Sequence, residues 1–307
     1  MLDATAAGVF TIAATPFLPD GSIDFDSIDR MVAFYLERGA TGLTLLGVMG
    51  EAPKLTAAES RAVVARVLTA VAGAVPVVVG VSAPGLAAMA ELAQAVVEAG
   101  AAGVMVQPGA GLGSDDELAD YFGHVSRALG PIPYVLQDFP LVTGVKTPAK
   151  VILRIVAENP TCVMLKHEDW PGLEKITALR RAESAGARRI AILCGNGGQF
   201  LPEELARGAD GAMTGFAFPE MMAGVVAAHR AGDRARMQDI FDAYLPLVRY
   251  EAQPGRGLAV RKYILAKRGA IAHDALRAPG GSLGPEARAE VDFLIARQER
   301  RLASLGF

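Results

Sequence analysis

Short apolar segments alternate with longer amphipathic segments along most of the chain, with a period of about 30 residues that is typical of βα units. The short segments are rich in Val, Ile and Leu, as expected for strands that are buried on both faces of a parallel sheet. The longer segments carry apolar residues at helical spacing. The pattern therefore predicts a parallel sheet covered by helices.

Eight βα units follow one another before the pattern ends. The predicted strands cover residues 8–13, 42–46, 75–80, 103–106, 133–137, 162–166, 189–194 and 211–214. The predicted helices cover residues 23–37, a segment that opens with a capping box from Thr56 to Glu59, and residues 84–99, 114–129, 147–157, 173–185, 199–207 and 219–231. Eight units in sequence favour a closed (β/α)8 TIM barrel over an open sheet.

The chain changes character after the eighth unit. Residues 234–307 predict about three more helices and contain no strand-like segment. No linker-like stretch separates this tail from the preceding units. We therefore expect a catalytic barrel over residues 1–231 and a three-helix extension over residues 232–307 that packs on it.

Composition narrows the class of protein. The length of 307 residues suits one α/β barrel with an extension, and a hydrophobic content of 51% provides a large core. No apolar run approaches the ~18 residues that span a bilayer, and the N-terminus lacks the basic flank of a secretory signal. We expect a cytoplasmic protein. A net charge of -3 argues against a nucleic-acid partner.

Cysteine and histidine usage gives no sign of a metal site. Cys162 and Cys194 both lie in apolar, strand-like runs, where a buried free thiol is the usual state. The histidines show no metal-ligand spacing; they are His124, His167, His229 and His273. We expect neither a metal nor a cofactor.

A lysine ends the predicted sixth strand. Three apolar residues, 163–165, lead directly into Lys166. Burial of an unpaired ammonium is costly and favours the neutral amine, and a neutral amine condenses with ketones to form a Schiff base. The alternative is a lysine that reaches solvent or pairs with Glu168. Because active sites of such barrels lie at the carboxyl ends of the strands, the position of Lys166 favours catalysis.

The same rule assigns other residues to this mouth of the barrel. They follow the other predicted strands and are Thr15, residues 47–51, Gln107, Pro108, Gln137, Asp138, Gly195, Asn196, Thr214 and Gly215.

Several of these segments together resemble the family of dihydrodipicolinate synthase and N-acetylneuraminate lyase, which are class I aldolase-type barrels. The motifs that carry the resemblance are residues 15–17, 47–51, 139–140 and 143–144, Lys166, and residues 195–196. The resemblance covers nearly the whole chain. It implies that Lys166 forms a Schiff base with pyruvate or another 2-keto acid, and that the protein is a homo-oligomer, either a dimer or a tetramer.

The chain departs from this family where a proton relay is expected. Val48 and Met49 replace two threonines, and Gln137 replaces a tyrosine at the end of the fifth strand. The substrate-binding arginine of the synthase would fall near Val142, and the tyrosine from its neighbouring subunit near Gly109. None of the relay replacements titrates. The resemblance therefore disfavours 4-hydroxy-tetrahydrodipicolinate synthase as the activity.

Other segments resemble the L-2-keto-3-deoxyarabonate dehydratase branch of the same family. They are residues 137–140, 211–219 and 245–247, Glu251, Gln253 and the helix that carries Lys262, whereas residues 47–50 and 166–168 match this branch less well. We therefore expect a Schiff-base lyase, a dehydratase or an aldolase, that acts on pyruvate or a 2-keto-3-deoxy sugar acid. A barrel that only binds a keto acid is the alternative from another class.

The chemistry suggests roles for the residues at the mouth. A lysine iminium stabilises a carbanion at C3 as an enamine, from which a C4 hydroxyl is lost or the C3–C4 bond breaks. Backbone N–H groups of Gly47, Val48 and Met49 would hold the substrate carboxylate. Gln137 would orient a hydroxyl or a water but cannot act as an acid or base. Glu51, a water or a substrate group would move protons, although Glu51 equally suits a helix-start charge.

The remaining candidates come from the last three strands. Met213 and Thr214 would line the imine side of the site, or alternatively pack the barrel end. Gly195 and Asn196 are assigned to substrate binding. Cys162 lies four residues before Lys166 and is expected to face the barrel interior with it. His167 would face the opposite side and pack there.

Overall fold

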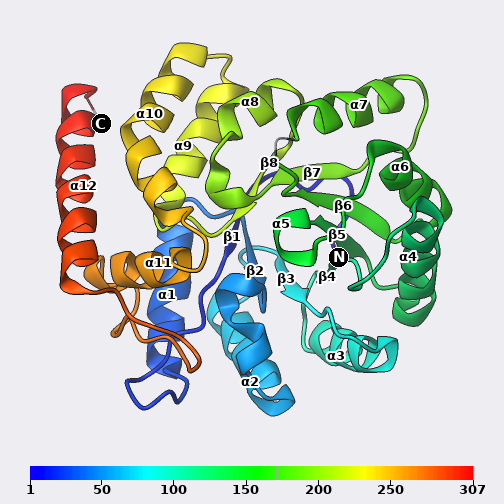
Figure 1. Ribbon diagram of the computed structural model, residues 1–307, viewed down its shortest axis with the longest axis horizontal. Coiled ribbons are helices and arrows are strands. Elements are labelled where there is room, and N and C mark those ends of the chain that lie inside the picture. Colours follow the sequence, from blue (N-terminus) through cyan, green and yellow to red (C-terminus); the bar gives the residue numbers. More distant parts are fainter. Residues whose placement is uncertain (171, 307) are drawn as a thin grey trace.

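The computed structural model describes residues 1–170 and 172–306. Within these residues, eight parallel strands pair in the order β1-β2-β3-β4-β5-β6-β7-β8 and close on themselves. Helices follow the strands and surround them (Figure 1). The prediction of a (β/α)8 barrel is confirmed.

Each predicted strand is present with small shifts at its ends. The strands are β1 Gly8–Ile12, β2 Gly42–Leu45, β3 Val77–Gly80, β4 Gly103–Val106, β5 Tyr134–Asp138, β6 Cys162–His167, β7 Ala191–Cys194 and β8 Gly211–Thr214. β3 begins after Pro76, which has no N–H for the ladder. β2 ends before Leu46, whose φ of 53° is left-handed.

The predicted helices around the barrel are also present. They are α1 Phe25–Glu37, α2 Ala57–Val71, α3 Leu86–Glu98, α4 Asp115–Leu129, α6 Ala149–Glu158, α7 Leu173–Ser184, α8 Leu201–Ala206 and α9 Pro219–Arg230. The capping box of α2 is confirmed, since Thr56 and Glu59 bond each other's backbone N–H. The sequence pattern does not predict the short elements in the loops: α5 Pro140–Thr143 and the 3-10 turns η1 Val48–Gly50, η2 Ala52–Lys54 and η3 Asn196–Gly198.

Large apolar side chains fill the barrel interior. Most of this inner cluster comes from alternate strand positions: Phe10, Ile12, Val78, Met105, Val135, Met164, Ala191, Leu193 and Met213. Gly42 makes room for one of them, because a Cβ at this position would lie 2.5 Å from the ring of Phe10. The interior is therefore a packed core below the mouth, as expected for this barrel type.

A β-bulge in β6 decides which of its side chains face inward. Tyr134 of β5 pairs with Cys162, but the next residue, Val135, pairs with Met164, so one residue of β6 is extra. Met164 belongs to the inner cluster, whereas Cys162 is buried with the apolar residues between strands and helices. The prediction that Cys162 faces the same way as Lys166 is wrong, because the bulge interrupts the two-residue alternation.

The described part of the tail, up to residue 306, contains three helices as predicted: α10 Arg234–Glu251, α11 Gly257–Lys267 and α12 Pro285–Ser304. They lie together along one side of the barrel (Figure 1), where α10 packs against α9, and α12 packs against α10. Arg277 of the connection between α11 and α12 pairs with Glu59 of α2 at 2.5 Å.

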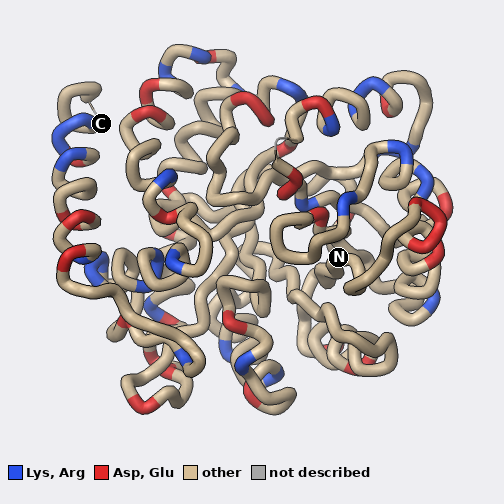
Figure 2. The backbone as a smooth tube through the Cα atoms, in the orientation of Figure 1, with Lys and Arg blue, Asp and Glu red and all other residues tan. Residues whose placement is uncertain are grey.

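Charged residues of both signs are mixed along the outer helices, and the strands carry few of them (Figure 2). None of the described helices combines the length and the apolar character needed to cross a membrane.

We predict that Gly42→Ala destabilises the barrel by about 1–3 kcal/mol, because the new methyl group overpacks against Phe10. Gly85→Ala is the matched control, since a Cβ at that position would have no atom within 4 Å. Urea denaturation of both variants checks this expectation. Equal urea midpoints for the two variants would show that a methyl group at residue 42 does not overpack against Phe10.

Candidate active site

Lys166 lies at the carboxyl end of β6 and faces the barrel interior. The bulge at the start of the strand puts Lys166 on the same side as Met164, which belongs to the inner cluster. Only 6% of the Lys166 side chain is exposed. A buried ammonium requires a partner. Lys166 has one, since its Nζ lies 2.9 Å from Oε2 of Glu168.

Glu168 is the centre of this group of polar side chains. Its Oε2 also accepts a hydrogen bond of 2.7 Å from Nε2 of Gln137 at the end of β5. One carboxylate oxygen therefore contacts both Lys166 and Gln137. The sequence pattern indicates Glu168 only as a possible pairing partner of the lysine. The signal for a larger role is its position two residues after Lys166, which puts both side chains on one face of an extended chain.

The loop after β7 encloses Glu168. A Cβ on Gly195 would lie 2.2 Å from Cγ of Glu168, so a larger residue at this position would displace the carboxylate. Asn196 is left-handed, with φ of 49°, and its Nδ2 donates a hydrogen bond of 2.7 Å to the backbone oxygen of Glu168. The structure thus brings the two predicted residues Gly195 and Asn196 to the carboxylate beside Lys166.

The end of β8 supports the same loop. Met213 is fully buried in the inner cluster. Thr214 accepts a hydrogen bond of 2.8 Å on Oγ1 from the backbone N–H of Gly197. Thr214 therefore contacts the η3 turn that begins at Asn196.

The turn after β2 presents backbone amides at the mouth. Its 3-10 turn η1 begins at Val48, and Thr15 donates a hydrogen bond of 2.6 Å to the carbonyl of Gly50. The first N–H groups of a helical turn have no acceptor within it, so the amides of Val48 and Met49 are available to a ligand. Met49 packs against the inner cluster, which fixes the turn over the barrel interior.

Glu51 follows this turn and is bonded to lysines. It is 2% exposed and left-handed, with φ of 53°. Its Oε1 lies 2.5 Å from Nζ of Lys262, and its Oε2 lies 2.7 Å from Nζ of Lys54. Burial lowers the pKa of Lys262, and the Glu51 carboxylate opposes that effect. Glu51 therefore joins the β2 turn to α11 of the tail.

The strand residues next to the site face away from it. Asp138 and His167 are register partners on β5 and β6. Burial raises the pKa of Asp138, whose Oδ2 accepts a hydrogen bond of 2.5 Å from Lys175. Nδ1 of His167 lies 3.2 Å from Oε1 of Glu204. His167 is buried on the outer side of the barrel wall, as expected.

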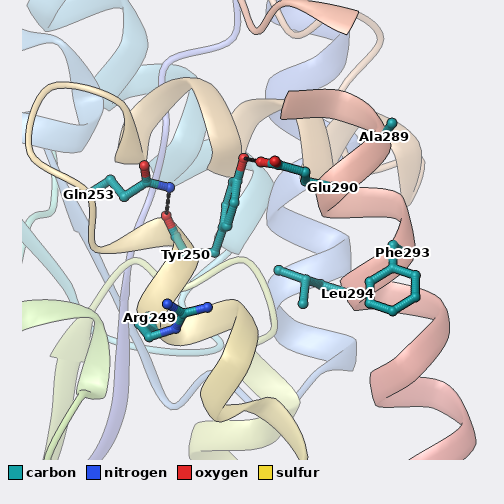
Figure 3. Close-up of a pocket in the computed structure, with 7 residues that line it drawn as sticks. All are labelled: Arg249, Tyr250, Gln253, Ala289, Glu290, Phe293 and Leu294. Carbon is teal, nitrogen blue, oxygen red and sulfur yellow. Dashed lines mark hydrogen bonds between the residues drawn. The ribbon is translucent and has the colours of Figure 1, made fainter. Parts of the chain in front are cut away.

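One small cavity adjoins the loop beside Glu168, and a larger groove lies away from the lysine site. A cavity of about 30 Å³ adjoins the loop after β7, and its lining includes Gly195 and Asn196. A larger groove of about 740 Å³ lies between α10 and α12, where Tyr250 donates a hydrogen bond of 2.5 Å to Glu290 (Figure 3). Its described lining residues belong to the tail, so this groove is separate from the lysine site.

The fold and the site define a class of protein. A buried lysine beside a carboxylate, at the carboxyl end of a (β/α)8 barrel strand, is an arrangement suited to carbonyl chemistry. The chain belongs to the dihydrodipicolinate synthetase family, whose model matches residues 5–298. It is a lyase of this family. The family resemblance inferred from the motifs is confirmed.

Relatives carry names for different reactions. The chain is 33% identical to a 4-hydroxy-tetrahydrodipicolinate synthase of Sorangium cellulosum, over 96% of this chain and 97% of the relative. It is 30% identical to the L-2-keto-3-deoxyarabonate dehydratase of Azospirillum brasilense, over 95% and 94%. The crystal structure of dihydrodipicolinate synthase from Rhodopseudomonas palustris is similar with a TM-score of 0.95 and 54% identity, over 96% and 99%.

We predict that Lys262→Met lowers the free energy of unfolding by about 3 kcal/mol, because it removes one of the two lysines that pair with the buried Glu51 carboxylate. The double variant with Glu51→Gln is expected to recover at least about 1 kcal/mol of that loss. A double-mutant cycle from denaturant titrations measures the coupling. Strict additivity would contradict a direct interaction between the two side chains.

Proposed function

We propose that this protein is a Schiff-base lyase that dehydrates a 2-keto-3-deoxy sugar acid, with Lys166 as the imine-forming residue. The observation that carries the proposal is the contact of one carboxylate oxygen of Glu168 with both Lys166, at 2.9 Å, and Gln137, at 2.7 Å. This contact supplies a proton carrier beside the amine. It also compensates for the missing tyrosine of the family relay.

Formation of the imine requires a neutral amine. Glu168 accepts a proton from the Lys166 ammonium, and the free amine attacks C2 of the keto acid. Glu168 then returns the proton to the hydroxyl of the resulting carbinolamine, which leaves as water, so that an iminium remains on Nζ and Glu168 is a carboxylate again. The positive iminium then makes the C3 hydrogens acidic, because the electrons of the broken C–H bond are delocalised into an enamine.

Dehydration then needs one acid–base group near C3 and C4. In the proposed step Glu168 takes the C3 proton, and it returns a proton to the C4 hydroxyl as that group leaves as water. Hydrolysis of the product iminium restores Lys166. Gln137 cannot exchange protons, so its function is to orient Glu168 through the amide hydrogen bond and the substrate through its remaining polar atoms.

The substrate carboxylate would be bound by the amides of Val48 and Met49 on the β2 turn. Val142, in the position of the synthase arginine, is apolar and 51% exposed. This residue offers no charge for a second carboxylate, which favours a sugar acid with one carboxylate over the substrates of the synthase. Retro-aldol cleavage starts from the same iminium, but it removes the proton of the C4 hydroxyl and breaks the C3–C4 bond, so product analysis separates the two reactions.

We predict that borohydride reduction traps a covalent adduct on Lys166 after incubation with pyruvate and, to a greater extent, with 2-keto-3-deoxyarabonate. Intact mass and peptide mapping measure the adduct. Lys166→Ala should abolish it, whereas Lys175→Ala, which removes a lysine paired with Asp138, should retain it. The absence of any adduct across a panel of 2-keto acids would reject the imine mechanism and favour a keto-acid-binding barrel.

We predict that Glu168→Gln lowers kcat by about 10²–10⁴-fold, because the amide retains hydrogen bonds but cannot carry a proton. The reduced adduct on Lys166 should still form with this variant, at a lower rate. Glu91→Gln is the control, since Glu91 lies in an exposed pair with Arg61. An unchanged kcat of Glu168→Gln would show that Glu168 is not the proton carrier, even if the lysine adduct is found.

A further inference from the structure

Three metal-binding side chains meet behind the wall of the barrel that carries Lys166. They are His167 at the end of β6, Cys194 at the end of β7 and Glu204 on α8. One nitrogen, one sulfur and one oxygen atom of this group lie within 4.8 Å of one another, and all three residues are buried. Because Lys166 and Glu168 face the interior, the proposed lyase mechanism does not use this cluster.

The separations are close to those of ligands around one cation. Ligands at the usual zinc distances in a tetrahedron lie roughly 3.3–3.7 Å from each other. Nδ1 of His167 and Oε1 of Glu204 are already 3.2 Å apart, and the sulfur of Cys194 lies within the same 4.8 Å group. Side-chain shifts of about 1 Å would therefore complete a three-ligand site.

Two unpaired buried atoms supply a second, independent observation. Within the described residues, Nε2 of His167 and Oδ1 of Asp138 have no hydrogen-bond partner, although both residues are buried and are register partners on adjacent strands. If a neutral His167 donates from Nδ1 to Glu204, Nε2 is a second buried acceptor without a donor. If Nδ1 binds a cation, Nε2 carries the hydrogen and becomes a donor.

Metal-binding histidines usually carry their hydrogen on the nitrogen that does not bind the metal. Burial and the Glu204 carboxylate raise the pKa of the Cys194 thiol well above its usual range. A thiol that binds a metal does so as the thiolate, so binding of a cation at Cys194 would release a proton.

The chemical types of the three ligand atoms indicate which metal the site would bind. Magnesium and calcium require oxygen ligands, whereas one imidazole, one thiolate and one carboxylate suit zinc. The cavity of about 30 Å³ beside the β7 loop is lined in part by Glu204 and Gly172, and it has about the volume of one water molecule. A water in this cavity would be the fourth ligand.

We propose that His167, Cys194 and Glu204 bind one zinc-class divalent cation, with a water as fourth ligand. The site is structural. Its cation would join β6, β7 and α8 directly behind Lys166, since His167 follows the lysine in the chain. The sequence spacing does not indicate it, because the three ligands come from separate elements that only the fold brings together.

The test uses the full chain without a histidine tag, expressed in zinc-supplemented medium. Elemental analysis is expected to find about one zinc per chain, and Co²⁺ loaded after chelation should give a thiolate charge-transfer band. Cys194→Ser and His167→Gln should lose both signals. Cys162→Ser is the matched control, because this buried cysteine lies outside the cluster and its variant should retain the metal and the band.

A second measurement covers the case in which the variants fail to fold. Zinc added to the chelated wild-type chain should raise Tm and release protons into a weakly buffered solution. The absence of both effects, together with zinc well below one per chain, would overturn the proposal. Metal that is retained by Cys194→Ser but lost by Cys162→Ser would also overturn it.

Discussion

The buried contact between Lys166 and Glu168 is the interaction on which the site depends. Separated from each other, either charge would be costly inside the barrel, and each removes much of the penalty for the other. The surrounding residues serve this contact: Gln137 donates to the carboxylate, and Gly195 leaves space for it. In the proposed mechanism Glu168 takes the proton of Lys166, because imine formation requires a neutral amine.

Side chains of β6 alternate between the barrel interior and the surrounding helices, so the two proposed sites lie on opposite faces of this strand. Met164 and Lys166 face the interior, while Leu165 and His167 face the helices. The bulge near the start of the strand sets this choice, since a shift of one residue would exchange the two sides. The proposed lyase site and the proposed cation site therefore share a strand but no side chain, and the cation would restrain the strand that positions the lysine.

The tail contacts the β2 turn and the start of α2 through the buried Lys262 and through Arg277. Lys262 of α11 reaches Glu51, which directly follows the turn whose amides would bind the substrate carboxylate. Arg277 also pairs with Glu59 at the start of α2. The helical extension thus supports the β2 turn electrostatically, and Glu51 acts as an anchor of that turn. This arrangement explains why both carboxylate oxygens of Glu51 have partners although the residue is buried.

The sequence by itself determined the eight strands, the surrounding helices and the position of Lys166 at the end of the sixth strand, because apolar periodicity and capping residues are local signals. It also indicated the family. Only the tertiary structure decided the contact of Glu168 with Gln137, the outward position of Cys162 and the meeting of His167, Cys194 and Glu204. These features depend on strand register, a bulge and the packing of distant elements, none of which is encoded in the spacing of neighbouring residues.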